Sequence, residues 1–219
     1  MIRIHSVQVG KVAPLGRKGI PSGFVKHTLD GRTSVFTHGL NGDEQADLRA
    51  HGGPHKAVYA YSLGHYSGWK ADFPGHSAIL IPGAFGENLT VEGLTENDIC
   101  VGDVHRIGTA ILQVSQPRQP CFKLALHFDD KHLPSAMVRS GRCGWYYRVL
   151  LQGELGPGDQ IELINRPQPT LSFRSLIDFV NFGKGTHEEL RALSSMEEVT
   201  AGIRRRAVEL LSARGFGNP

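Results

Sequence analysis

Residues 115–124 read Ser-Gln-Pro-Arg-Gln-Pro-Cys-Phe-Lys-Leu, which places a single cysteine directly after two closely spaced prolines. Each proline fixes its own φ and disfavours helical backbone in the residue before it, so we expect Gln116 and Gln119 to be extended. The residues before this stretch, 110–115, are typical of a strand. Cys121 is therefore expected on a stiff, irregular loop at the end of that strand.

The charges around this cysteine indicate what it could do. Arg118 and Lys123 flank it, and nearby cations favour the thiolate, the form that binds metals and attacks electrophiles. Free cysteines are more often buried and act as inert, small apolar residues. The two cations and the paired prolines favour a metal ligand or a nucleophile over that alternative.

Length and composition limit the classes of protein to which the chain can belong. The chain has 219 residues, 40% hydrophobic and 21% charged, as expected for a globular protein of one large domain or one domain with a small appendage. No apolar run is long enough for a membrane helix, and the first residues lack the apolar core of a signal peptide. The three cysteines form no CxxC pair, which argues against disulfides and predicts a cytoplasmic protein. Three cysteines are also too few for a self-contained four-cysteine iron–sulfur site.

The net charge and the histidines give little support to two further classes, nucleic-acid-binding proteins and zinc proteins. A net charge of +3 is too small to indicate nucleic-acid binding, although a local group of cations could bind a phosphorylated small ligand. His51 and His55 have the spacing of zinc ligands on a helix, but the Gly-Gly-Pro between them makes a helix improbable. We therefore expect no zinc site.

Residues 1–165 are typical of a β-structure with short strands separated by glycine and proline. Two short helices are expected over 63–72 and 131–140. This pattern predicts an irregular β-barrel or sandwich, mainly β in class. The expected strands are 2–9, 56–62, 110–115, 145–151 and 160–164.

After residues 166–169 the pattern becomes helical. Residues 172–182 are apolar at helical spacing, 186–189 form a capping box that begins a second helix, and 195–198 are predicted to begin a third. Fifty residues in three helices have little core of their own, so they should dock on the β-domain. Arg204, Arg205 and Arg206 on the last helix are expected to form a solvated face, with DNA contact as the alternative.

Three more segments have the glycines and polar side chains of binding loops. The first spans 39–59 and its glycines match no nucleotide motif, so it is equally well explained by tight turns. In the second, 83–90, Glu87 and Asn88 could bind a heterocycle. In the third, 139–146, Arg142 could pair with an anion, although an arginine that is simply exposed at the surface is the commoner explanation. The residues alone thus predict a cationic pocket with one activated cysteine.

Taken together and in order, these segments resemble the MOSC family, named for the C-terminal domain of molybdenum cofactor sulfurases. The matching residues are 42–47, 51–53 with 56–58, 85–89 and 116–121. The likeness covers about residues 1–165. The helical tail resembles the small C-terminal domain of the YiiM-type subgroup, which is associated with resistance to N-hydroxylated base analogues.

The resemblance implies a MOSC-type β-barrel over 1–165 and a three-helix domain over 170–219. It also implies that the barrel holds the pterin-based molybdenum cofactor, with Cys121 as the metal ligand or sulfur carrier. A thiolate is a suitable ligand for a heavy transition metal, and nearby cations could neutralise the anionic cofactor. The residues expected around the cofactor are His51, Lys56, Glu87, Asn88, Gln116, Arg118, Lys123 and Arg142.

The activity that the resemblance implies is reduction of N-hydroxylated compounds, such as N-hydroxylaminopurine, to amines, as a form of detoxification. The chain has no cysteine-rich ferredoxin segment, so electrons are expected from a separate reductase of the flavoprotein class. One alternative is a carrier of sulfur or of the molybdenum cofactor, with a persulfide on Cys121. Another is a DNA-binding regulator that uses the arginine-rich last helix.

Overall fold

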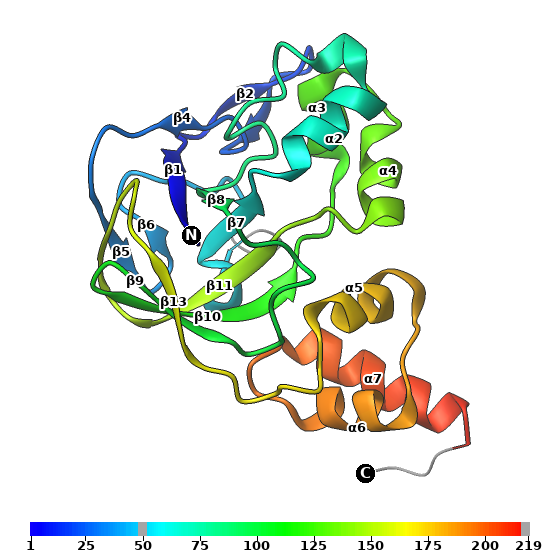
Figure 1. The fold of residues 1–219 in the computed structure, drawn as a ribbon. Coiled ribbons are helices and arrows are strands. Elements are labelled where there is room, and N and C mark those ends of the chain that lie inside the picture. Colours follow the sequence, from blue (N-terminus) through cyan, green and yellow to red (C-terminus); the bar gives the residue numbers. More distant parts are fainter. Residues whose placement is uncertain (48–51, 216–219) are drawn as a thin grey trace.

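The computed structural model describes residues 1–47 and 52–215. A large β-sheet occupies the centre, short helices cover one end of it, and three helices lie together beyond the other end (Figure 1). The class is therefore mixed α/β, with a larger helical share than the mainly β class predicted from the sequence. The described helices include none long and apolar enough to cross a membrane.

The main sheet has eight strands in the order β13-β9-β10-β11-β7-β8-β1-β4. Its pairs are antiparallel except β7 with β8. Along the chain the strands are β1 (Arg3–Val9), β4 (His27–Thr28), β7 (Val58–Ser62), β8 (Leu89–Glu92), β9 (Val104–Ile107), β10 (Ala110–Pro117), β11 (Trp145–Leu151) and β13 (Ile161–Asn165). Smaller sheets are formed by β2 (Ala13–Leu15) with β3 (Ile20–Ser22), and by β5 (Thr33–Phe36), β6 (Gly39–Leu40) and β12 (Gly153–Leu155).

The two halves of the sheet are joined through β7. All five residues of this strand are buried, as expected for a strand that is covered on both faces. Its parallel neighbour β8 is reached through the helix α2 (His65–Asp72) and the short turn η2 (Pro74–His76), because parallel strands need a crossover connection. This crossover confirms the helix predicted over 63–72.

A closed barrel was expected, whereas the strand order is that of an open sheet. The N-terminal end of β1 still approaches the other edge, with an isolated bridge between Arg3 and Gln160. Backbone hydrogen bonds join Ile4 to Asp159 and Gly158 to Ile4, with N–O distances of 2.9 and 2.8 Å. The two edges of the sheet therefore meet at a point, without a continuous ladder of strand pairs.

Two helices follow the strand β10. The helix predicted over 131–140 is α4 (Leu133–Ser140), preceded by α3 (Phe122–Phe128), which was not predicted. Cys121 is the N-cap residue of α3, so the expected irregular loop is only three residues long. The helix α3 begins directly after Cys121 and so fixes its backbone on the C-terminal side.

The tail contains α5 (Phe173–Phe182), α6 (His187–Ser195) and α7 (Ala201–Ala213). The capping box at Thr186 and Glu189 is confirmed. The third helix, however, begins at Ala201 and not at 195–198. The connection before it forms a turn over 197–199, and Met196 and Val199 of this connection are buried in the core.

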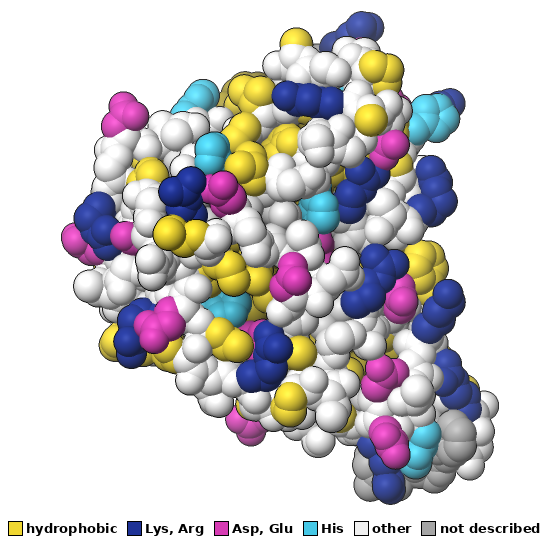
Figure 2. Space-filling model, viewed as in Figure 1, with side chains coloured by type: hydrophobic (Ala, Val, Ile, Leu, Met, Phe, Trp, Pro, Cys, Tyr) yellow, Lys and Arg dark blue, Asp and Glu magenta, His cyan; other side chains and the backbone are white. Residues whose placement is uncertain are grey.

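Most of the arginine run on α7 makes internal hydrogen bonds. Arg204 donates to the carbonyls of Met196 and Val199, and Arg206 donates to the carbonyl of Val180. Arg205 alone among the three is exposed. On the face of the molecule in Figure 2, acidic and basic side chains are interspersed, in keeping with the small net charge.

The tail is joined to the sheet by polar and apolar contacts. Asp103 is fully buried and accepts hydrogen bonds from Nε and Nη2 of Arg166 at 2.9 and 2.7 Å. The amide of Phe173, which is itself fully buried, donates to Ile99. One hydrophobic core thus extends from the sheet into the helices; the division into domains 1–165 and 170–219 stays a prediction.

Removal of the chain after Arg166 is expected to produce a poorly soluble or unstable protein. Leu176 and Ile177 of α5 are fully buried, and their loss would leave apolar surface of the sheet exposed. Large buried residues contribute about 2–5 kcal/mol each, a large part of the roughly 5–15 kcal/mol that stabilises a domain. Urea unfolding of both proteins measures the difference; equal midpoints and solubility would contradict this expectation.

Candidate functional site

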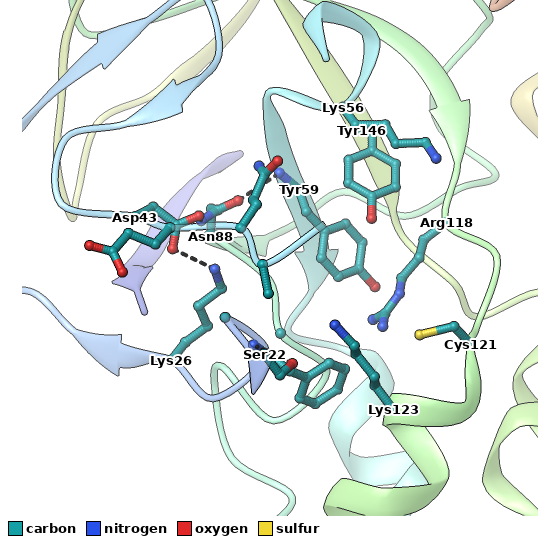
Figure 3. A pocket seen from close by; sticks show the side chains of 16 residues that line it. Ser22, Lys26, Asp43, Lys56, Tyr59, Asn88, Arg118, Cys121, Lys123 and Tyr146 are labelled. Carbon is teal, nitrogen blue, oxygen red and sulfur yellow. Dashed lines mark hydrogen bonds and ion pairs between the residues drawn. The ribbon is translucent and has the colours of Figure 1, made fainter. Parts of the chain in front are cut away.

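A hollow of about 590 Å³, open to solvent, lies beside β7 and β11 (Figure 3). The segments that surround it are far apart in the sequence: the stretch after β3, the stretch after β6, the turn η1 (Pro54–Lys56), the loop before β8 and the loop after β10. Its charged, thiol and aromatic lining residues are Phe24, Lys26, Asp43, Glu44, Lys56, Tyr59, Arg118, Cys121, Lys123 and Tyr146.

Cys121 is the candidate reactive group of this pocket. Its backbone is extended, with φ −112° and ψ 174°. The thiol is partly exposed, and in Figure 3 its sulfur points toward the side chains of Arg118 and Lys123. The other two cysteines are buried, and burial raises the pKa of both Cys100 and Cys143.

Arg118 places a permanent positive charge beneath the pocket. It is only 7% exposed, donates to the carbonyl of Phe85, and stands 5.0 Å from the ring centroid of Tyr59 and 5.3 Å from that of Phe24. Burial by itself lowers the pKa of Arg118, but nearby Tyr59, Tyr146 and Cys121 together raise it above its usual value. The guanidinium therefore stays charged although it is buried.

Two lysines add positive charge to the same cavity. Lys123 donates to the backbone carbonyl of Pro21 at 3.2 Å, while Lys56 enters from η1, where burial lowers its pKa. Within the described part of the chain, no carboxylate is paired with Arg118 or Lys123. This side of the pocket is therefore suited to an anionic group.

The opposite wall is an ion pair whose hydrogen bonds are satisfied within the protein. Lys26 and Asp43 are 2.5 Å apart, with side chains 5% and 3% exposed. Asp43 also accepts from the amide of Gly10 at 2.7 Å and from Nδ2 of Asn88 at 2.9 Å, and Asn88 in turn accepts from the amide of Tyr59. These contacts make the wall a rigid, neutral unit.

Asp43→Ala is expected to lower the free energy of unfolding by about 3–5 kcal/mol, because it leaves the Lys26 ammonium buried without its partner. Glu44→Ala is the matched control, since its pair with Lys11 is exposed and exposed pairs contribute little. Urea denaturation of the two variants measures the difference. Equal midpoints for the two variants would show that the Lys26–Asp43 pair contributes no more than an exposed one.

Five of the predicted site residues are brought together in this pocket. They are Lys56, Asn88, Arg118, Cys121 and Lys123. Glu87 is turned away from it: this side chain is fully buried and accepts hydrogen bonds from Gly83, Phe85, Tyr66 and Thr90. Glu87 therefore holds the loop that presents Asn88 and does not face a ligand.

The other predicted residues lie elsewhere. Arg142 stacks on Trp69, 4.0 Å from the centroid of a ring, and pairs with Asp72 beside a separate shallow hollow. Gln116 is buried and does not line the pocket. His51 lies outside the described residues. The described ranges contain no group of three His, Cys, Asp or Glu side chains that could hold a metal ion.

Sequence reasoning missed the aromatic lining. The rings of Tyr59 and Tyr146 are 5.1 Å apart between centroids, and both residues line the pocket. The hydroxyl of Tyr59 donates to the carbonyl of Cys143 at 2.8 Å. Burial raises the pKa of both phenols, so they remain neutral hydrogen-bonding groups. The alternation of Tyr59 with the residues around it indicates only a strand, so no local pattern distinguishes it from the core.

With this geometry established, comparison with known proteins gives the family. The MOSC domain model matches residues 47–162, more than half of the chain. The chain belongs to the MOSC domain family. The matched range contains Lys56, Tyr59, Arg118, Cys121 and Tyr146, so the cationic side of the pocket lies within the MOSC domain. The Lys26–Asp43 wall precedes it.

Several relatives support this assignment. The MOSC chain is 42% identical to protein YiiM of Escherichia coli over 149 residues, which are 68% of this chain and 66% of that protein. It is 38% identical to a reductase of Gibberella moniliformis over 173 residues, 78% of this chain but 30% of that protein. The crystal structure of YiiM from Geobacillus stearothermophilus superposes with a TM-score of 0.80 at 31% identity, covering 96% of this chain and 100% of that one. The fold is therefore YiiM-like, including the C-terminal helices.

Proposed function

We propose that this MOSC protein binds the pterin-based molybdenum cofactor in the pocket of Cys121 and reduces N-hydroxylated compounds to amines. One observation carries the proposal: a partly exposed thiol shares a solvent-open cavity with the buried charge of Arg118. Membership of the family and the similarity to a fungal reductase support it.

The side chains present fit that group. A thiolate is a soft ligand suited to molybdenum, and Cys121 is the single cysteine that lines the pocket. Arg118 and Lys123 would hold the anionic part of the pterin through charge-assisted hydrogen bonds, with Lys56 at the same side of the cavity. When bound, the cofactor would supply two-electron redox chemistry.

The protein itself would bind, orient and shield. Tyr59, Tyr146 and Phe24 would provide flat surfaces for a ring system, and the neutral pair of Lys26 and Asp43 lines the cavity as well. Reduction of an N-hydroxyl group to an amine consumes two electrons and two protons and releases water. We propose that a flavoprotein reductase supplies the electrons.

Protein purified from a host that makes the cofactor tests the proposal. We expect one molybdenum and one pterin per chain, and conversion of N-hydroxylaminopurine to adenine when a chemical reductant is supplied. Absence of molybdenum and of turnover would overturn it. Cyanide-labile sulfur on Cys121 without molybdenum would instead identify the protein as a sulfur carrier.

A further inference from the structure

Glu87 is a charged side chain that the proposed function leaves without a role in the chemistry. It is fully buried. Its Oε1 accepts from the amide of Gly83 at 2.8 Å, from the hydroxyl of Thr90 at 3.0 Å and from the hydroxyl of Tyr66. Its Oε2 accepts from the amide of Phe85 at 3.2 Å. The carboxylate is therefore fixed by four donors, two of them backbone amides of the loop before β8.

Phe85 connects this carboxylate to the cationic side of the pocket. Its amide donates to Glu87, and its carbonyl accepts from Nη1 of Arg118. A single residue thus separates the buried carboxylate from the guanidinium. The ring of Phe85 is itself fully buried and stacks on Tyr61, with the centroids 4.7 Å apart, so the side chain anchors the residue that makes both bonds.

The bond between Arg118 and Phe85 joins two loops that the sheet keeps apart. Phe85 precedes β8 and Arg118 follows β10, and in the sheet the strands β11 and β7 lie between these two. The intervening strands carry Tyr146 and Tyr59, which line the pocket. The separation of the two loops is therefore set by contacts such as this hydrogen bond and not by pairing of their own strands.

The carbonyl of Phe85 also determines how Arg118 is turned. A guanidinium carries five N–H donors in one rigid plane, so a bond from Nη1 sets the directions of the other donors. The rings of Tyr59 and Phe24 lie 5.0 and 5.3 Å from the charge, but the face of a ring attracts a cation without directing its individual N–H groups. The position of the Phe85 peptide then decides which donors Arg118 presents to the cavity.

We propose that Glu87 is a positioning residue, which holds the Phe85 peptide and through it directs the Arg118 guanidinium into the pocket. A carboxylate suits this place because all four of its partners donate, whereas an amide has one accepting oxygen and a donating NH2 group. This inference rests on the proposed function for its consequence in cofactor binding, but the direction of Arg118 does not depend on it.

Glu87→Gln removes the bond to Phe85 with little change in side-chain volume. The amide oxygen is expected at the place of Oε1, where it keeps three donors, so the NH2 group faces the amide of Phe85 and two donors oppose each other. Tyr66→Phe is the matched control. It removes one donor to the same carboxylate and leaves the Phe85 amide with its acceptor.

Side-chain NMR of protein labelled with [15N]arginine measures the effect without any cofactor, in full-length protein from a host that does not make it. The Arg118 signals are identified by their absence from an Arg118→Lys sample. Glu87→Gln should raise the rate at which the Arg118 guanidinium protons exchange with water about three- to tenfold, the factor that corresponds to loss of one ordinary hydrogen bond. Tyr66→Phe should leave that rate unchanged.

The wild-type protein alone can overturn the inference, even if a variant fails to fold. Its Arg118 protons should exchange much more slowly than those of Arg205, which is exposed on α7; equal rates would show that the Phe85 carbonyl does not hold the guanidinium. Equal Arg118 rates in wild-type and folded Glu87→Gln protein would also overturn it. So would an equal increase in the Glu87→Gln and Tyr66→Phe variants.

Pterin content provides the second readout, in protein from a host that makes the cofactor. If the proposed function is correct, Glu87→Gln protein should copurify with severalfold less pterin, and Tyr66→Phe protein with nearly the wild-type amount. A raised Arg118 exchange rate in the Glu87→Gln variant of a protein that never contains pterin would refute the proposed function and leave the positioning role intact. An unchanged exchange rate in a protein that does contain pterin would refute the positioning role alone.

Discussion

Cys121→Ser protein should fold normally and lose all measurable reduction of N-hydroxylated bases. A neutral hydroxyl is a poor replacement for a thiolate as a ligand of a heavy metal, and the side chain is partly exposed at the end of a rigid loop, so the substitution changes no core packing. Molybdenum content and turnover with a chemical reductant measure the effect, and circular dichroism reports the fold.

The two buried cysteines supply the controls. Cys100→Ser and Cys143→Ala should retain most activity, since neither side chain lines the pocket. Cys143 is 2% exposed, so its truncation should lower stability slightly and leave the chemistry in place. Full turnover by the Cys121→Ser protein would show that Cys121 has no essential role in the reaction.

Arg118→Ala should lose cofactor and stability together. A charge-assisted hydrogen bond contributes about 1.5–3 kcal/mol, so pterin binding should weaken by roughly ten- to a hundredfold. The substitution also leaves the carbonyl of Phe85 without its donor, and an unsatisfied buried group costs about 1–3 kcal/mol. Pterin content per folded molecule, with urea unfolding beside it, separates the two effects.

Arg205→Ala is the appropriate control for Arg118→Ala. Arg205 is exposed on α7, whereas Arg204 and Arg206 hold backbone carbonyls of the tail. The Arg205 variant should keep its pterin and its unfolding midpoint. Addition of cofactor should partly restore the Arg118→Ala protein. A full complement of pterin with reduced turnover in that variant would assign Arg118 to the substrate.

The sequence was sufficient to predict the cationic side of the pocket, because its signals are local. Proline geometry determines the loop of Cys121, and the neighbouring charges of Arg118 and Lys123 are adjacent in the chain. The capping box of α6 is local in the same way. Each of these features depends on residues within a few positions of one another.

The remainder of the site depends on long-range packing. Glu87 and Asn88 are neighbours, yet the Glu87 carboxylate accepts from four internal donors whereas Asn88 lines the pocket. No local sequence pattern distinguishes these two environments. Arg142 follows a glycine in a polar stretch, but packs against Trp69 of a distant helix. The open edge of the sheet depends on the pairing of β1 with β8 and β4, which the sequence of β1 does not specify.

The burial of Arg118 has a consequence for salt dependence. Exposed charges are largely screened beyond about 8 Å at physiological ionic strength, so a site made of surface lysines weakens steeply as salt rises. The Arg118 guanidinium is largely covered by Tyr59, Phe24 and backbone, so mobile ions screen its charge less than they screen a surface charge. Its dehydration occurs during folding, before any ligand arrives. An anion in this pocket should therefore lose less affinity as salt rises than an anion bound by surface lysines alone.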